Sequence, residues 1–478
     1  MKRNLIVIAI LFLCVRGLTV YNYNIKHRTY YYYGMVNSQF MIADAAYKGH
    51  WFSYELGKNV MGKANEIEKF IPIEEYKNFE GSGSYVTFPA IDLPGYGYLI
   101  AFTSKYFGKE LTSKYAHAIQ ILMELASLLL FIYCVGLHLG ERTSFISGLL
   151  YVFCYPFIWP IASQPMRDIF LMPIFAFYIA AFFLFSRAVN IRAYIPVVLL
   201  VLAASFLLWF RPSGYYFFFL MSPLCLFVKN KSLISRFALF LMTLLIPFLA
   251  FGMPFKSFNL RHYGVENTRV IGRGMWEGMG IIKDNPYGFV LDDSALVPWC
   301  KEQGYDVEYS SPEMNKILAD YVVKIIKEDP GYYLKTVLVR MKFIATSQLT
   351  FILPFKIVKE GQDDIKLKDY VKHPKNLIKH PKGFILRIIR LFLAHIYGSA
   401  FFYTAVILAF LMLFRLKGKR IGLIVLLSPV IFSLASQIPI HFEPRNFAVG
   451  AWPLVFPLAW LVDRIIKNRE MSPNKTES

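Results

Sequence analysis

The chain has 478 residues, of which 56% are hydrophobic and 18% are charged, and its mean hydropathy is +0.42. Such an apolar composition excludes a soluble globular protein of this length and indicates many membrane spans. The formal net charge of +20 could suggest nucleic-acid binding, but the basic residues fall between apolar runs and in one long loop. We therefore expect no nucleic-acid partner, and attribute the positive charge to membrane topology and contact with anionic membrane lipids.

Runs of about 16 to 22 apolar residues are long enough to cross a bilayer as helices. The first lies at 4–21, and we expect it to be an uncleaved span because no A-x-A-like cleavage site follows it. Nine more lie at 115–138, 144–163, 169–186, 194–210, 215–228, 234–253, 396–414, 421–440 and 447–463. The sequence therefore predicts an all-α polytopic membrane protein of about ten transmembrane helices.

Positive charge collects in alternate connections between these spans, as it does in cytoplasmic loops. The basic groups on one side are Lys2 with Arg3, Arg142, Arg187 with Arg192, Lys229 to Arg236, Arg415 to Arg420, and Arg464 to Arg469. We expect a multi-pass protein of the cytoplasmic (inner) membrane with both termini cytoplasmic. The outer side then receives two long loops, 21–114 and 254–395, and three short turns.

The predicted organisation is an N-terminal transmembrane module (1–253, with the first outer loop at 21–114), an outer cap (254–395), C-terminal transmembrane helices (396–463) and a cytoplasmic tail (464–478). The cap is expected to be mainly helical, because 312–340 has apolar residues at helical spacing with a break at Asp329-Pro330-Gly331. A span at 343–358 would leave too few residues for a compensating span, so 343–358 and 384–395 predict helices lying in the membrane interface.

Carboxylates in the outer segments are the candidates for catalysis. Asp44 lies on a predicted helix, 38–48, that follows four consecutive tyrosines. A carboxylate among aromatics at the bilayer surface would be partly desolvated and suited to take a proton from an acceptor hydroxyl, although a solvated surface Asp is the simpler interpretation. Asp168 opens the fourth span, where it could equally cap a helix, and Asp92 before Pro94 could simply form a turn.

Arginines on the outer side are candidates for holding a phosphate. Arg211 lies at the outer end of the fifth span, against the positive-inside trend, and could alternatively snorkel at a helix end. Arg167 lies beside Asp168 at the outer end of the fourth span. Arg445 shares a turn with Glu443. A guanidinium offers a lipid phosphate several donors and keeps its charge, while an ion pair of Glu443 with Arg445 that only pins the turn is the alternative.

Further residues could contact a substrate. His50 lies near Asp44, and Trp276, Glu277 and Tyr287 could line a sugar site, although the aromatic core of the cap is the more ordinary place for such rings. No zinc-type Cys/His spacing is present, so we predict no specific metal ligands. Carboxylates alone could still recruit a divalent cation.

Several of these motifs resemble those of GT-C type membrane glycosyltransferases, the class that includes protein O-mannosyltransferases and the aminoarabinose transferase of lipid A. The similar segments, in chain order, are Ala43-Asp44-Ala-Ala-Tyr47-Lys-Gly49-His-Trp51, Leu93-Pro94-Gly95-Tyr96-Gly-Tyr98, Arg167-Asp168, Phe210-Arg211-Pro212 and Phe442-Glu443-Pro-Arg445-Asn. The chain departs from the pattern in one respect. By spacing from Gly49, the usual first-loop acidic position falls near 35–37, where no carboxylate is present.

The resemblance implies inverting transfer of a sugar from a polyprenyl-phosphate donor to a lipid, glycan or protein acceptor of the cell envelope. Asp44, or Asp168, would activate the acceptor. The donor phosphate would be bound by Arg445, Arg211 and Arg167, and the substrates contacted by Asp92, Tyr96, His50, Glu443, Trp276 and Glu277. The alternatives are a non-enzymatic lipid-glycan transporter or flippase, and an inactive GT-C-like scaffold. Apart from Arg16, Glu124 and some histidines, the candidate groups cluster at one membrane face, which favours the enzyme.

Overall fold

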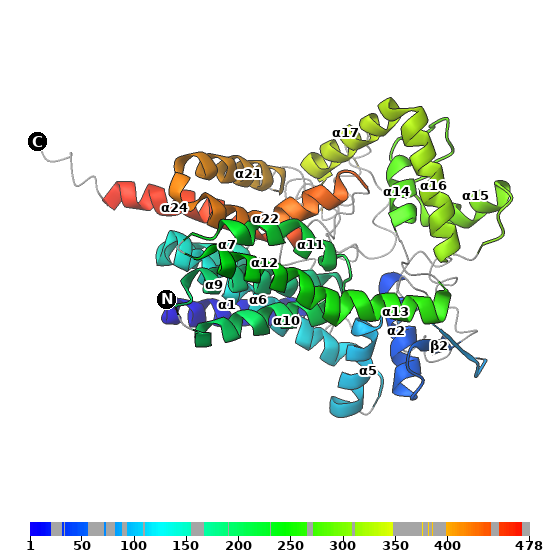
Figure 1. Ribbon diagram of the computed structural model, residues 1–478, viewed down its shortest axis with the longest axis horizontal. Coiled ribbons are helices and arrows are strands. Elements are labelled where there is room, and N and C mark those ends of the chain that lie inside the picture. The colour runs from blue at the N-terminus through cyan, green and yellow to red at the C-terminus, as the bar shows by residue number, and fades with distance from the viewer. Residues whose placement is uncertain are drawn as a thin grey trace, which may run out of the picture.

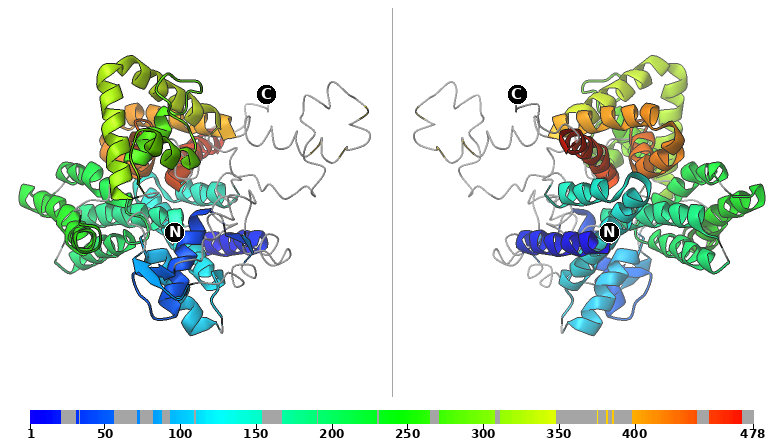
Figure 2. Two further views of the ribbon diagram at one scale, coloured as in Figure 1. Left: turned by 90° about the vertical axis from the view of Figure 1, so that its right-hand side faces the viewer. Right: turned by 90° about the vertical axis from the view of Figure 1, so that its left-hand side faces the viewer.

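The computed structural model is a bundle of long helices with a group of shorter helices at one end (Figure 1). We call this end the cap end, and the opposite end, which carries Met1 and the end of the last helix, the terminus end. Figure 2 views the molecule from these two ends. The structure describes residues 1–20, 31–32, 34–55, 71–72, 82–87, 93–108, 110–153, 167–189, 191–229, 231–264, 271–307, 311–347, 375, 381, 385, 398–440 and 449–470.

The bundle is built from α1 (Lys2–Val20), α6 (Lys114–Leu139), α7 (Glu141–Phe153), α9 (Leu171–Arg187), α10 (Ile195–Leu207), α11 (Gly214–Met221), α12 (Leu233–Pro247), α21 (Gly398–Arg415), α22 (Arg420–Gln437) and α24 (Val455–Glu470). Short 3-10 segments adjoin them: η2 (Arg167–Phe170), η3 (Ile191–Tyr194), η4 (Ser222–Phe227), η9 (Lys417–Lys419) and η10 (Trp452–Leu454). A π-helical segment, η5 (Phe248–Gly252), joins α12 to α13 (Met253–Tyr263).

The predicted fold class is confirmed: this is a polytopic helical membrane protein. Among the described residues six helices are long and apolar enough to cross a membrane, and shorter apolar helices cover Arg192–Leu207, Gly214–Phe227 and Ala400–Arg415. The predicted third span begins as α7, and 154–166 lies outside the described ranges. Helices suit this role because a helix satisfies its own backbone hydrogen bonds where lipid offers none.

Burial separates a central helix from a peripheral one. The apolar window of η2 and α9 is 83% buried, whereas that of α12 to α13 is 17% buried. Aromatic rings fill the space around α9, with the Phe175 ring 4.6 Å from that of Phe217. α13 continues α12 to Tyr263, so the helix extends past 253, the predicted end of the span. Hydropathy marks where a membrane ends, but nothing requires the helix to stop there.

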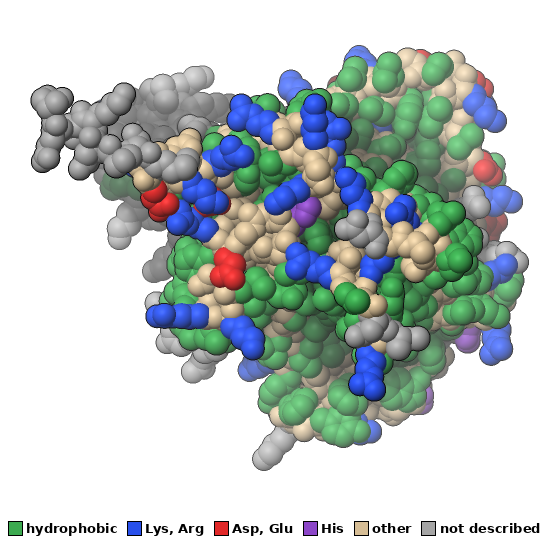
Figure 3. Space-filling model, turned by 60° about the vertical axis from the view of Figure 1, so that its left-hand side comes forward, with side chains coloured by type: hydrophobic (Ala, Val, Ile, Leu, Met, Phe, Trp, Pro, Cys, Tyr) green, Lys and Arg blue, Asp and Glu red, His purple; other side chains and the backbone are tan. Residues whose placement is uncertain are grey.

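The terminus end gathers basic side chains, as Figure 3 shows with that end turned forward. The N-terminal amine lies 2.7 Å from Glu141, and Arg142 lies 2.9 Å from Glu470. Arg187 donates to the Leu137 carbonyl at 2.7 Å and Lys419 to the His138 carbonyl at 2.6 Å. Arg187 and Lys419 therefore cap the C-terminal end of α6, where the helix dipole favours positive charge.

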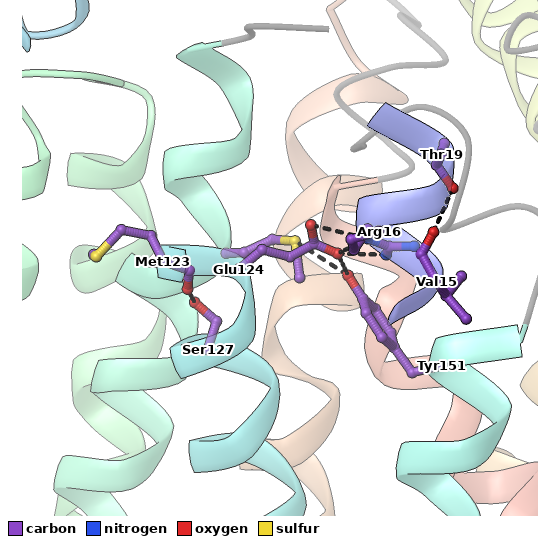
Figure 4. A network of polar contacts seen from close by, with 8 residues as sticks. Val15, Arg16, Thr19, Met123, Glu124, Ser127 and Tyr151 are labelled. Atoms are coloured by element: carbon purple, nitrogen blue, oxygen red, sulfur yellow. Dashed lines mark hydrogen bonds and ion pairs between the residues drawn. The ribbon is translucent and has the colours of Figure 1, made fainter. Parts of the chain in front are cut away.

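Inside the bundle three helices meet at a buried ion pair (Figure 4). Arg16 of α1 is 1% exposed and Glu124 of α6 is 0% exposed. The Arg16 Nε donates to Glu124 Oε1 at 3.1 Å, and the same oxygen accepts from the Tyr151 hydroxyl of α7 at 2.7 Å. The Arg16 guanidinium also lies 4.8 Å from the Phe12 ring centroid. A buried charge without its counter-charge is energetically costly. The ion pair therefore favours the packing of α1 against α6 and α7.

The first long loop adds α2 (Gly34–Tyr47), α5 (Gly95–Phe107) and two short antiparallel ribbons. The ribbons pair β1 (Tyr31–Tyr32) with β3 (Ile71–Pro72) and β2 (Ser53–Glu55) with β4 (Tyr85–Thr87), a small departure from the predicted all-α fold. The helix predicted at 38–48 corresponds to α2, which begins earlier, at Gly34, and ends at Tyr47. Both α2 and α5 run across the bundle direction at the cap end (Figure 1).

The described part of the cap holds α14 (Ile271–Met279), η6 (Asp293–Ala295), α15 (Leu296–Glu302), α16 (Pro312–Glu328) and α17 (Pro330–Ser347). The helix and break predicted over 312–340 are confirmed. The Ser311 hydroxyl caps α16 by accepting from the Met314 amide at 3.1 Å. Asp329 ends the helix, and its carboxylate accepts from the Tyr332 amide at 2.8 Å. The interfacial helices predicted at 343–358 and 384–395 lie mostly outside the described residues.

Replacing Glu124 with Gln tests the buried ion pair. The variant leaves the Arg16 charge buried without its counter-charge, so we expect the free energy of unfolding to fall by about 3–5 kcal/mol. Thermal unfolding in detergent would measure this as a lower melting temperature. Glu141→Gln is the control, because the Glu141 side chain is 62% exposed and its loss should cost at most about 1 kcal/mol. Equal melting temperatures for the two variants would contradict the role given to the pair.

Candidate functional site

Asp44 lies on α2 and is 9% exposed, as expected of a partly desolvated carboxylate. Neighbouring residues of the helix, Phe40, Ala43 and Ala46, are buried in an apolar cluster with Tyr96 of α5. The Asp44 Oδ2 forms an ion pair at 3.0 Å with the ammonium of Lys48, one helical turn later. The burial of one face of α2 thus leaves Asp44 at the edge of the cluster, with a cation beside it.

Lys48 also reaches a second carboxylate. Its Nζ lies 3.1 Å from Glu55 Oε2, and Glu55 Oε1 accepts from the Gly83 amide at 3.1 Å. Burial by itself would lower the pKa of Lys48, but the hydrogen bonds and charges of Asp44 and Glu55 outweigh it and raise that pKa. The ammonium therefore stays charged at neutral pH.

The chain between the two carboxylates makes a tight, partly strained connection. Phe52 has a φ of 60°, which non-glycine residues rarely adopt, and its amide donates to the Tyr98 hydroxyl at 2.9 Å. His50 is exposed, and its ring stacks on Tyr85 of β4 at 3.6 Å. The predicted substrate residue His50 thus lies on the surface between Asp44 and Glu55 in the chain. The next two residues, Trp51 and Phe52, are also exposed.

α5 joins this loop to the cap end of the bundle. A Cβ added to Gly95 would lie 2.5 Å from the Trp209 carbonyl oxygen, and the Gly95 amide donates to that oxygen at 3.3 Å. Next to Gly95, Tyr96 is 1% exposed and donates to Gln120 Oε1 at 3.1 Å. Tyr96 was predicted to contact substrate; its side chain is buried here, and that role stays a prediction. Its ring fills the core between α5 and the bundle. The start of α5 packs directly against the bundle, so a large apolar ring at this position is buried.

Asp168 and Arg211 form one ion pair at the same end. The Arg211 Nε lies 2.9 Å from Asp168 Oδ1. Asp168 is 1% exposed and its neighbour Arg167 is 8% exposed. The adjoining rings of Phe170 and Phe210 stack at 4.2 Å. The sequence assigned the two residues separate roles, one as a base and the other as a phosphate ligand. Their pairing offsets both charges and fixes the orientation of the guanidinium.

The cap contributes less to a surface site than predicted. Trp276 is 0% exposed, and its ring lies 5.8 Å from both Phe289 and Trp299. The indole is enclosed in the apolar core of the cap, and the sugar contact of Trp276 stays a prediction. Glu277, its neighbour, is 8% exposed and pairs with Arg273 at 2.8 Å.

An arginine of α17 helps to connect the cap to the bundle. Arg340 of α17 is 0% exposed. Its guanidinium donates to the Gly278 carbonyl of α14 at 2.6 Å, to the Ile438 carbonyl at 2.7 Å and to the Pro439 carbonyl at 3.2 Å. A Cβ added to Gly278 would overlap the Ile440 carbonyl oxygen, so the two backbones are in direct contact. Burial lowers the pKa of Arg340 to about 10, and the group remains charged at neutral pH.

This contact lies immediately before the segment in which the sequence predicts a turn with Glu443 and Arg445. Both residues, and Asp92, lie outside the described ranges, so their predicted roles stay predictions. Glu277 adjoins Gly278, which meets the backbone of Ile440 immediately before that turn. The cap therefore fixes the last described residues before the predicted phosphate-binding turn.

The sequence reasoning missed Lys48, Glu55 and Arg340. Lys48 could have been found, because a cation four residues after Asp44 on a helix is a standard ion-pair spacing. Glu55 depends on the β2–β4 ribbon, and Arg340 on the docking of the cap, for which a single sequence carries no local signal. Over the described ranges no group of three or more His, Cys, Asp or Glu residues is placed to hold a metal ion.

The fold and this arrangement of charges define a polytopic membrane protein with polar clusters at its cap end. No protein-family model matches the chain, and no curated protein matches it. Among solved structures it is similar to an oligosaccharyltransferase of Archaeoglobus fulgidus tethered to an acceptor peptide, with a TM-score of 0.49 and 12% identity over 100% of this chain and 52% of that one. The chain thus spans about half the length of that protein.

It is also similar to ArnT of Cupriavidus metallidurans bound to undecaprenyl phosphate. The TM-score is 0.42 and the identity 10%, over 98% of this chain and 79% of that one. Because both TM-scores are below 0.5, the function proposed below depends on the chain's own residues.

Changing Arg340 tests the connection between cap and bundle. Arg340→Met removes the side-chain donors that Arg340 offers to three backbone carbonyls, which should cost at least about 1–3 kcal/mol of local stability. Hydrogen–deuterium exchange in 271–347 and 432–440 should then be about 5- to 150-fold faster. Lys335→Met, at an exposed position on the same helix, should change neither segment. Unchanged exchange in Arg340→Met would show that other contacts hold the cap.

Proposed function

We propose that this protein is a membrane glycosyltransferase. In this proposal it moves a sugar from a polyprenyl-phosphate-linked donor to a lipid, glycan or protein acceptor at the outer face of the cytoplasmic membrane. The observation that carries the proposal is the gathering of ionised groups at the cap end. The Asp44–Lys48–Glu55 cluster and the Asp168–Arg211 pair come from distant parts of the sequence and flank one apolar cluster, which contains Phe170 and Phe210.

The distribution of basic residues supports the orientation. Arg142, Arg187 and Lys419 lie at the terminus end with both Met1 and Glu470. Since positive charge favours the cytoplasmic side, the cap end would be the outer one. A donor carried in the membrane brings its sugar to that surface, so the site needs no sugar-nucleotide motif.

The proposed reaction is a direct displacement at the anomeric carbon. The acceptor oxygen forms the new bond on the face opposite the phosphate, and the carbon–oxygen bond to the phosphate breaks with its electron pair leaving on the lipid phosphate. Asp44 receives the acceptor proton as general base. Arg445 and Arg211 would hold the phosphate and stabilise its growing negative charge. Asp168 then positions Arg211 through the 2.9 Å ion pair and is the less favoured base.

The buried charges of the bundle support the enzyme over a transporter. A transporter is expected to place ionisable groups along a path through the spans. Arg16 and Glu124 lie enclosed in the described bundle, where Glu124 is bonded to both Arg16 and Tyr151. This arrangement holds the helices together, and neither charge is accessible to a transported solute. An inactive GT-C-like scaffold remains the other alternative, since Asp44 lies beyond the usual acidic position.

Replacing Asp44 with Asn tests the proposed base. We expect transfer from polyprenyl-phosphate sugars, measured with membranes from a strain expressing the variant, to fall by about 10²- to 10⁴-fold. Asp320→Asn is the control, because Asp320 is exposed on α16 and its loss should leave transfer unchanged. Cell-envelope glycans that are unchanged in both Asp44→Asn and Asp168→Asn strains would refute the catalytic assignment and leave the scaffold as the better reading.

A further inference from the structure

Lys48 occupies a particular position: its ammonium lies between two carboxylates. The Nζ is 3.0 Å from Asp44 Oδ2 and 3.1 Å from Glu55 Oε2. The side chains of Asp44 and Glu55 are 12% and 10% exposed, whereas that of Lys48 is 38% exposed. Two shielded carboxylates thus converge on one cation that faces the surface.

Both carboxylates are held there by backbone structure. Asp44 and Lys48 are four residues apart at the end of α2, and the Lys48 amide donates to the Asp44 carbonyl at 3.1 Å. Glu55 ends β2 and lies opposite Tyr85 of β4. The Gly83 amide, which donates to Glu55 Oε1, comes from a residue with a φ of +71°. Because that conformation suits glycine, the described residues just before β4 are shaped to place this donor.

Two carboxylates that converge in this way commonly bind a divalent cation, because Mg²⁺, Mn²⁺ and Ca²⁺ prefer oxygen ligands. Here the position between the oxygens is filled by an ammonium, a compact point charge with three donors. A divalent ion bound at the same position would meet the Lys48 charge at close range. The residues present therefore do not fit a metal ion between Asp44 and Glu55.

We propose that Lys48 is a built-in cation that takes the place of a divalent metal ion between Asp44 and Glu55. In consequence this pair of carboxylates recruits no metal while Lys48 is present. Lys48 is then a positioning residue that sets the direction of the Asp44 carboxylate, and Glu55 completes the cluster. The positioning role depends on the proposed glycosyl transfer, whereas the metal replacement does not.

The metal replacement is tested by measuring Mn²⁺ binding to the purified full-length protein with electron paramagnetic resonance. We expect Lys48→Ala to gain one Mn²⁺ site per chain that disappears in Lys48→Ala/Glu55→Gln. Wild type, Lys48→Arg and the control Lys105→Ala, at an exposed lysine of α5, should lack that site. Lys48→Gln serves as a second variant should Lys48→Ala fail to fold, and its melting temperature should rise with added Mn²⁺ while that of wild type does not.

Either of two results would overturn the proposal. One is a wild-type Mn²⁺ site that Glu55→Gln removes, which would place a metal alongside Lys48. The other is a folded Lys48→Ala or Lys48→Gln protein that gains no site, which would show that the carboxylates are not arranged for a metal. Where sugar transfer is measurable, EDTA should leave wild-type transfer unchanged, and Mn²⁺ should restore transfer to Lys48→Ala. The binding arm needs no transfer assay, so failure of the proposed function is distinguishable from failure of this inference.

Discussion

The arrangement of the cap end depends on one close backbone contact, between Gly95 and the Trp209 carbonyl oxygen. An added Cβ would lie 2.5 Å from that oxygen, so only glycine permits the contact without a shift. It places the start of α5 directly against the turn that leads to Arg211. Because α5 packs on α2, the same contact fixes Asp44 relative to the Asp168–Arg211 pair. Because Gly95 has no side chain, two loops far apart in the sequence can pack together at the cap end.

Charge is distributed along the bundle according to its electrostatic cost. At the terminus end, cations cap helix ends and face the surface. In the interior, the enclosed Arg16 is compensated by Glu124 and Tyr151. At the cap end the ionised groups are shielded yet near the surface, as in the Asp44–Lys48–Glu55 cluster. This third environment strengthens electrostatic interactions without removing the groups from a substrate, and it is where chemistry is best placed.

The sequence predicted the features that depend on local pattern. Hydropathy located the spans, because burial in lipid requires long apolar runs. Local chemistry located the helix around Asp44 and the break at Asp329-Pro330, since proline has no amide donor to continue a helix. The sequence could not predict the features that depend on which faces of the helices and loops pack together. Tyr96 and Trp276 were read as lining a site, but the same rings serve equally as core. The Asp168–Arg211 and Lys48–Glu55 pairs require loop docking that no single sequence encodes locally.

The location of a bound lipid phosphate is the most direct test of the central claim, that the cap end holds the donor. The protein would be reconstituted in nanodiscs, labelled with a photoreactive polyprenyl phosphate, and the labelled peptides mapped by mass spectrometry. We expect saturable labelling of peptides at the cap end, within 93–108, 207–215 and 438–450, that competes with unlabelled polyprenyl phosphate. Labelling confined to the terminus end, near Arg187 and Lys419, or no saturable labelling at all, would contradict the claim.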